Sequence, residues 1–156
     1  MSQELVFAIA QAQAAYGRCL DEDRLEDWPD FFAQDCLYRV TSAQNIRDGY
    51  EASLIFLNSK GMVRDRITAL RDANIYERQA YRHVIGQPLI TAQTKERVTS
   101  EASFIIARIM RDGTTDLFAT GRYLDSWRQT SAGLELIERV VVCDSSRIDT
   151  LLALPL

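Results

Sequence analysis

The spacing of hydrophobic and polar positions changes about half-way along the chain. From Leu5 to Leu20 apolar side chains recur every three or four positions, which predicts an amphipathic helix with Ser2 as its N-cap. From Tyr81 onward the apolar positions recur every two residues, as is typical of strands. The pattern therefore predicts helices early in the chain and a sheet late in it.

Shorter elements are predicted between these two regions. Asp27 is expected to cap a short helix that carries Pro29 in its first turn. Residues 36–40 alternate as a strand does, whereas the apolar run 54–57 fits either a buried strand or a helix. A third helix is expected from a single apolar stripe formed by Val63, Ile67 and Leu70.

The second half of the chain predicts an antiparallel meander. Hairpin-turn signals stand at residues 112–113 and 131–133. We expect a single α+β domain over residues 1–156, in which N-terminal helices pack on a curved, mainly antiparallel sheet that wraps the first helix. Such an arrangement often forms an open cone with a pocket inside. The predicted strands are residues 81–90, 98–111, 115–128 and 134–144.

Composition and charge exclude several classes of protein. The net charge of −4 and pI near 5.0 leave no basic stripe that would neutralise nucleic-acid phosphates. The three cysteines (Cys19, Cys36 and Cys143) are far apart and odd in number, so we expect reduced, buried thiols rather than disulfides. No apolar run approaches membrane-spanning length, and the first residues lack the basic region of a signal peptide. The sequence predicts a soluble, cytoplasmic protein.

The chain has one histidine, His83, and this limits its metal chemistry. A Rieske cluster needs two cysteines and two histidines, and a non-haem iron triad needs two histidines and a carboxylate. Zinc hydrolases also use more than one histidine. We therefore expect no metal and no cofactor within this chain alone.

Acid–base chemistry in the cone remains open. His83 lies on a predicted strand and could face a cavity with Tyr38, Asp125 or Tyr123. A histidine beside a carboxylate can act as a general base near neutral pH, because its ordinary pKa is about 6.5. The alternative is a hydrogen-bonded core or interface histidine. That second interpretation is favoured, because no partner is recognisable in the sequence.

Charged residues gather around the third helix and the strand that follows it. Arg64, Arg66, Arg71 and Arg82 stand among acidic residues in this region. They predict either an anion site or a subunit contact. The alternative is a solvated helix face with intrahelical ion pairs, which composition alone slightly favours.

The apolar residues 151–156 make a second candidate contact. A free tail of this character would be an exposed adhesive patch, so it should dock on its own domain or on another subunit. We hypothesise that it docks on another subunit. The residues that would make this contact are Leu152, Leu154 and Leu156.

Three segments carry a family resemblance: LEDWPDFFAQDCLYRV, GMVRDRITALRDANIYERQAYRHVIG and ATGRYLDSWRQTSAGLELIERVVVCDSS. In this order they resemble the small (β) subunits of Rieske-type aromatic-ring-hydroxylating oxygenases. Within that family the chain is most similar to the subunits of aromatic-acid oxygenases, particularly terephthalate 1,2-dioxygenase. Salicylate 5-hydroxylase, anthranilate dioxygenase and benzoate dioxygenase are near competitors. Residues 76–80 depart from the hydrocarbon-dioxygenase pattern, which argues against partners of the naphthalene or biphenyl type.

The resemblance implies an NTF2-like (cystatin-like) cone that scaffolds a large (α) subunit, in an α3β3 hexamer or as a homotrimer or other homo-oligomer when alone. It implies that the large subunit carries a Rieske [2Fe–2S] cluster and mononuclear Fe(II), with electrons from NADH through a separate reductase. It carries no catalytic residue over to this chain. Candidate subunit contacts are then Arg64, Arg66, Arg71, Arg82, His83, Leu152, Leu154 and Leu156.

Two other functions stay open at this point. One is a free-standing isomerase or dehydratase of the same fold, which would use His83 or Asp125 with Tyr38 in the cone. The other is a small-molecule-binding module. Neither would need a partner subunit.

Overall fold

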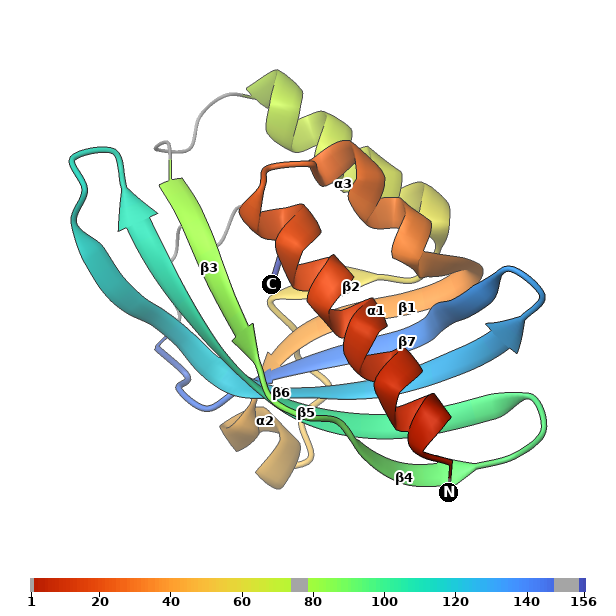
Figure 1. Cartoon of the computed structure of the whole chain (residues 1–156). Helices are drawn as coiled ribbons and strands as arrows, with labels where there is room; N and C mark the ends of the chain where they lie inside the picture. The colour runs from red at the N-terminus through yellow and green to blue at the C-terminus, as the bar shows by residue number, and fades with distance from the viewer. Residues whose placement is uncertain (1, 74–78, 148–154) are drawn as a thin grey trace.

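A seven-stranded sheet curves behind the N-terminal helix in the computed structural model, which describes residues 2–73, 79–147 and 155–156 (Figure 1). Its strand order is β2-β1-β7-β6-β5-β3, with β4 also paired to β5. β1 runs parallel to β7, and the other pairs are antiparallel. The strands are β1 (Phe32–Ser42), β2 (Ile55–Leu57), β3 (Gln79–Ile85), β4 (Leu89–Gln93), β5 (Arg97–Met110), β6 (Thr115–Thr130) and β7 (Gly133–Cys143).

The helices lie mainly on the concave side of this sheet. α1 crosses that face, and α3 packs against β1 and η1 (Figure 1). The Ser2 hydroxyl caps α1 by accepting a hydrogen bond from the Leu5 N–H at 3.2 Å. The helical segments are α1 (Gln3–Asp21), the 3₁₀ helix η1 (Leu25–Phe31), α2 (Ala43–Arg47) and α3 (Lys60–Ala73).

Most predicted elements are present, with three differences. The strand predicted over 81–90 is two strands, because Pro88 has no N–H for the ladder and the chain bends at 86–88 before it pairs with β5 again. Asp27 is not a cap, since η1 begins at Leu25 after Asp23 turns the chain with φ +59°. α2 was not predicted. The apolar run at 54–57, for which the sequence left strand and helix open, contains the strand β2.

Aromatic side chains fill the space between the helical segments and the sheet. Trp28 packs edge-to-face against Phe32 and Tyr38, with ring centroids 5.2 and 5.1 Å apart. The apolar stripe predicted for the third helix is confirmed, since Val63 and Ile67 are buried and Leu70 packs against the core. None of the helices in the described part of the chain is long and apolar enough to cross a membrane.

Candidate functional site

A buried ion pair joins β6 to β7 inside the cone. Arg139 donates from Nε and Nη2 to the two carboxylate oxygens of Asp125, each at 2.8 Å, and both side chains have 0% exposure. The strand register places these residues directly opposite each other. Removing two charges from water is costly, and the cost is offset only when the geometry is good and further hydrogen bonds are made. The two-point contact supplies the geometry and Gln13 adds one further hydrogen bond to Asp125, while Nη1 of Arg139 has no hydrogen-bond partner among the described residues.

α1 completes the environment of this pair. The Arg139 guanidinium packs against two aromatic rings, 4.2 Å from the centroid of Tyr16 and 3.9 Å from that of Tyr123. Gln13 donates to Asp125 at 3.3 Å. Burial alone would lower the pKa of Arg139, but attraction to Asp125 and its hydrogen bonds outweigh burial and raise that pKa above its usual value. The arginine therefore stays charged in the core.

The end of the described chain also lies in this interior. Leu156 has 0% exposure, and its carbonyl oxygen accepts hydrogen bonds from the hydroxyls of Tyr16 at 2.8 Å and Tyr38 at 3.0 Å. Its N–H donates back to the Tyr38 oxygen at 3.0 Å. Burial raises the pKa of Tyr16 and raises that of Tyr38 well above 10. Both hydroxyls are therefore protonated donors across the physiological range.

This position corrects the expectation for Leu156. We hypothesised that it contacts another subunit, but it packs into the core of its own chain, where an apolar side chain leaves water and its main-chain groups find partners. Leu152 and Leu154 lie outside the described residues.

His83 has a partner that the sequence did not suggest. Its side chain is 1% exposed, and its Nδ1 lies 2.6 Å from Oδ1 of Asp21, the last residue of α1. Its backbone N–H donates to the same carboxylate at 2.9 Å. Gly17 allows the close packing, because a Cβ there would lie 3.1 Å from the His83 Cβ. His83 is thus bonded to Asp21, and to neither Tyr38 nor Asp125, and it ties the end of α1 to the edge strand β3.

A groove of about 970 Å³ lies between α1 and β3. Its lining includes Phe7, which is 64% exposed, together with Arg82 and His83. Two of the residues predicted as subunit contacts therefore border one concave surface.

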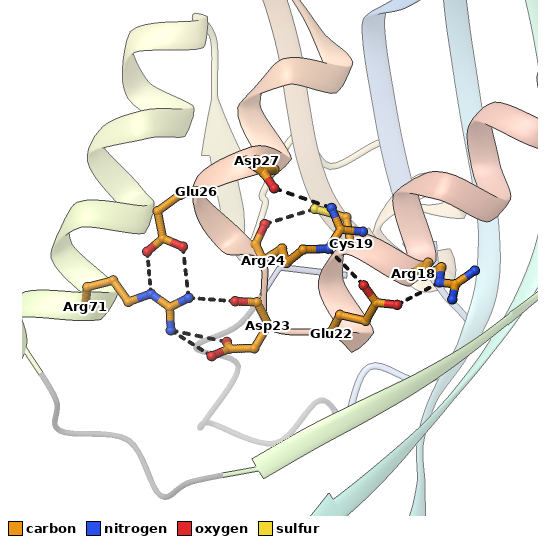
Figure 2. Close-up of polar contacts among 8 residues, drawn as sticks. All are labelled: Arg18, Cys19, Glu22, Asp23, Arg24, Glu26, Asp27 and Arg71. Carbon is orange, nitrogen blue, oxygen red and sulfur yellow. Dashed lines mark hydrogen bonds and ion pairs between the residues drawn. The ribbon is translucent and has the colours of Figure 1, made fainter.

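Arg71 joins α3 to the turn after α1, as Figure 2 shows. It donates to the Glu26 carboxylate at 2.7 and 3.1 Å, and to the carboxylate and the carbonyl oxygen of Asp23 at 3.0 and 2.8 Å. These bonds fix the left-handed backbone at Asp23. For Arg71 the intrahelical ion-pair interpretation is therefore wrong, since its partners come from another element.

The other arginines of the predicted cluster differ in environment. Arg64 and Arg82 are exposed, while Arg66 is half-buried, and burial lowers its pKa. A second set of ion pairs continues along the turn beside the Arg71 contacts (Figure 2). Its members are Arg18, Glu22, Arg24 and Asp27.

The donor set of this chain does not fit a Rieske cluster or a mononuclear iron site. The chain has a single histidine, whereas a Rieske cluster and a mononuclear iron triad each need two. The cysteines, Cys19, Cys36 and Cys143, are buried and unpaired by disulfide. Within residues 2–73, 79–147 and 155–156, His, Cys, Asp and Glu form no group of three that could hold a metal ion.

Comparison with known proteins identifies a family that this chain matches along nearly its whole length. The model of the SnoaL-like domain matches residues 3–140. Subunit β 1 of the terminal oxygenase component of terephthalate 1,2-dioxygenase, from Comamonas sp, is 46% identical over 148 residues, which are 95% of this chain and 96% of the relative. The anthranilate 1,2-dioxygenase small subunit of Burkholderia cepacia is 35% identical over 96% of this chain and 93% of its own length. This chain belongs to the small (β) subunits of aromatic-ring-hydroxylating dioxygenases.

Solved structures agree with the family. A chain from Novosphingobium aromaticivorans, described as the β subunit of an aromatic-ring-hydroxylating dioxygenase, superposes with a TM-score of 0.91 at 40% identity and covers 99% of this chain and 98% of its own. The β subunit of the benzoate 1,2-dioxygenase of Burkholderia mallei has a TM-score of 0.75 at 16% identity, over 92% of this chain and 93% of its own, which shows the shared fold alone. The predicted NTF2-like fold of this β subunit is confirmed.

Removal of the Asp125 charge tests the buried ion pair. Asp125→Asn leaves Arg139 charged and uncompensated in the core, so we expect the free energy of unfolding to fall by about 3–5 kcal/mol. Urea denaturation followed by far-UV circular dichroism measures this. Asp116→Asn, on the exposed start of the same strand, is the matched control and should change stability by less than about 0.5 kcal/mol. Equal effects of the two variants would contradict the assigned importance of the pair.

The Arg71 contacts predict a pH dependence. The hydrogen bonds from Arg71 lower the pKa of Glu26 in the folded chain, so their stabilisation is complete above the unfolded pKa of about 4.3 and is lost as the pH falls through the folded value. Arg71→Gln should cost about 1 kcal/mol at pH 7, since the groups are largely exposed. The difference from the unsubstituted chain should shrink below pH 4. Arg64→Gln, from an exposed position of the same helix, should show neither effect.

Proposed function

We propose that this β subunit scaffolds a terminal oxygenase that hydroxylates an aromatic carboxylate. The observation that carries the proposal is similarity along almost the whole chain to two subunits whose oxygenases are named for terephthalate and anthranilate. Both of those molecules are benzene rings that bear a carboxylate. A subunit of this kind is expected to serve the same class of substrate, with the reacting ring bound by the large subunit.

The environment of the acid–base groups supports a scaffolding role. Asp125 is engaged by Arg139 and Gln13, and Nδ1 of His83 is engaged by Asp21. The Tyr38 hydroxyl both donates to and accepts from Leu156. A free-standing isomerase or dehydratase needs a base within reach of its substrate. Asp125 and Tyr38 are already bonded within the chain, and Nε2 of His83, which has no hydrogen-bond partner among the described residues, is buried. The iron chemistry that the side chains of this chain do not fit is therefore expected on a second polypeptide.

The proposed partner is a large subunit that holds a Rieske [2Fe–2S] cluster and mononuclear Fe(II). These groups would supply electron transfer and oxygen activation, with NADH oxidised by a separate reductase. The proposed assembly is an α3β3 hexamer in the cytoplasm, where the three free cysteines of this chain would remain reduced.

The outer face of the sheet offers a surface for such an assembly. Val84 on β3 and Ile105 on β5 are paired in register and are 60% and 48% exposed, and Leu117 on β6 is 67% exposed. Leu117 is paired with Ala107, two residues along from Ile105. Neighbouring exposed apolar side chains of this kind mark interaction surfaces. We infer that this outer patch (Val84, Ile105 and Leu117) contacts a subunit. Arg82, which is exposed on β3 together with Val84, borders the patch.

Co-purification tests the proposed function. When this chain carries an affinity tag and is co-expressed with the large subunit of its oxygenase, we expect a stoichiometric complex that contains iron and sulfide. The same chain purified alone should contain no stoichiometric iron. The complex, supplied with reductase and NADH, should consume NADH with aromatic carboxylates and not with naphthalene. A chain that never retains the large subunit would contradict the proposal.

Substitution in the outer patch tests the proposed subunit contact in the same co-purification experiment. Ile105→Asp should reduce the yield of complex at least tenfold, because a carboxylate would be buried without a partner in the contact. Leu89→Asp changes another exposed apolar residue, on β4, and is the matched control, for which we expect the full yield. Circular dichroism of each isolated chain separates loss of contact from loss of fold.

A further inference from the structure

Leu156 lies in the core and has two features that small ligands also have. One is a compact apolar side chain, and the other is an oxygen that accepts hydrogen bonds from two hydroxyls, those of Tyr16 and Tyr38. Buried hydroxyls require partners, so two donors that converge on one point define a place for an acceptor oxygen. The main-chain oxygen of Leu156 occupies the position in which the carbonyl or carboxylate oxygen of a ligand would bind.

The surroundings of this position suit an aromatic ring that bears a negative charge. Tyr38 packs edge-to-face with Trp28 and Phe32, at centroid distances of 5.1 and 5.9 Å, so flat apolar surfaces line the position. A buried anion needs hydrogen bonds, and the two hydroxyls supply them at this position.

We propose that the Tyr16–Tyr38 pair is a binding site for a small aromatic carboxylate, and that Leu156 of the same chain occupies this site as a stand-in. The choice of an aromatic carboxylate rests on the proposed function, because such molecules are the ones that this assembly would meet. A bound carboxylate takes the two hydroxyl donors that Leu156 now uses, and its ring takes the place of the leucine side chain. No covalent step is involved.

Competition with Leu156 sets the strength of binding. The apparent affinity of a site equals the intrinsic affinity multiplied by the fraction of molecules in which the site is open. Loss of the leucine side chain weakens the hold of residue 156 on the interior, so it raises that fraction. Because burial raises the pKa of both tyrosines, the two donors keep their protons at neutral pH and need no titration to bind the anion.

Isothermal titration calorimetry of the full chain, without any large subunit, tests the proposal with benzoate as the probe. Leu156→Gly should bind benzoate at least tenfold more tightly than the unsubstituted chain. Addition of Tyr38→Phe to Leu156→Gly should weaken binding at least tenfold, since one of the two donors is lost. Toluene, which has the same ring and no carboxylate, should bind at least tenfold more weakly than benzoate. Leu89→Gly, at an exposed position, should leave benzoate binding unchanged.

Three results would overturn the proposal. They are benzoate binding by Leu156→Gly that is no tighter than that of the unsubstituted chain, binding that does not depend on Tyr38, and toluene binding as tight as benzoate binding. The last would mean that the variant holds only an apolar cavity, which takes any small aromatic molecule. If circular dichroism shows Leu156→Gly to be unfolded, the milder Leu156→Ala takes its place.

A second measurement uses the unsubstituted chain. Selective labelling of leucine methyl groups, assigned for Leu156 by comparison with Leu156→Ala, should show the Leu156 signals shifting as benzoate is added. Signals that stay fixed at saturating benzoate would refute displacement. Because the large subunit is absent from both experiments, failure of this site and failure of co-purification are distinguishable.

Discussion

The contact between Arg139 and Asp125 is the interaction around which the interior of the cone is arranged. It lies where β6 and β7 face each other, and the rings of Tyr16 and Tyr123 both contact the guanidinium. A charge at this depth is tolerable only with its partner in place, so the ion pair fixes the register of the hairpin as well as the distance of α1 from the sheet. The hydrogen bond from Gln13 adds a direct tie between helix and strand.

The same arrangement engages Asp125 and the hydroxyls of Tyr16 and Tyr38 in contacts within the described part of the chain. A cone of this fold can enclose a pocket, but in this chain the hydroxyls of Tyr16 and Tyr38 hold Leu156, and Asp125 is held by Arg139. His83 is bonded to Asp21 and serves to join α1 to β3. The family of the chain and the bonding of its interior therefore agree: this subunit is expected to support chemistry that takes place on another polypeptide.

The periodic part of the fold was predictable from sequence, and its long-range contacts were less so. Spacing of apolar residues located α1, α3 and the strands, because amphipathic elements bury one face. The Arg139–Asp125 pair could be predicted from the sequence, because both residues lie nearly the same number of positions from the turn at 131–133. Only the bulge between Ser126 and Trp127 changes the register between that turn and the pair. The Asp21–His83 contact left none, because it joins the end of a helix to a strand 62 positions away. Nor did periodicity place Leu156 inside its own core, since an apolar tail fits an intersubunit contact equally well.

We expect this chain to support turnover without supplying a reacting group. The decisive measurement is the rate of aromatic-acid hydroxylation per assembled complex, with His83→Ala in place of the unsubstituted chain. The amount of complex is quantified separately by native mass spectrometry. Loss of the Asp21–His83 contact should lower the stability of the chain or the yield of complex, while the rate per intact complex stays within twofold. Intact assembly with turnover abolished would contradict it.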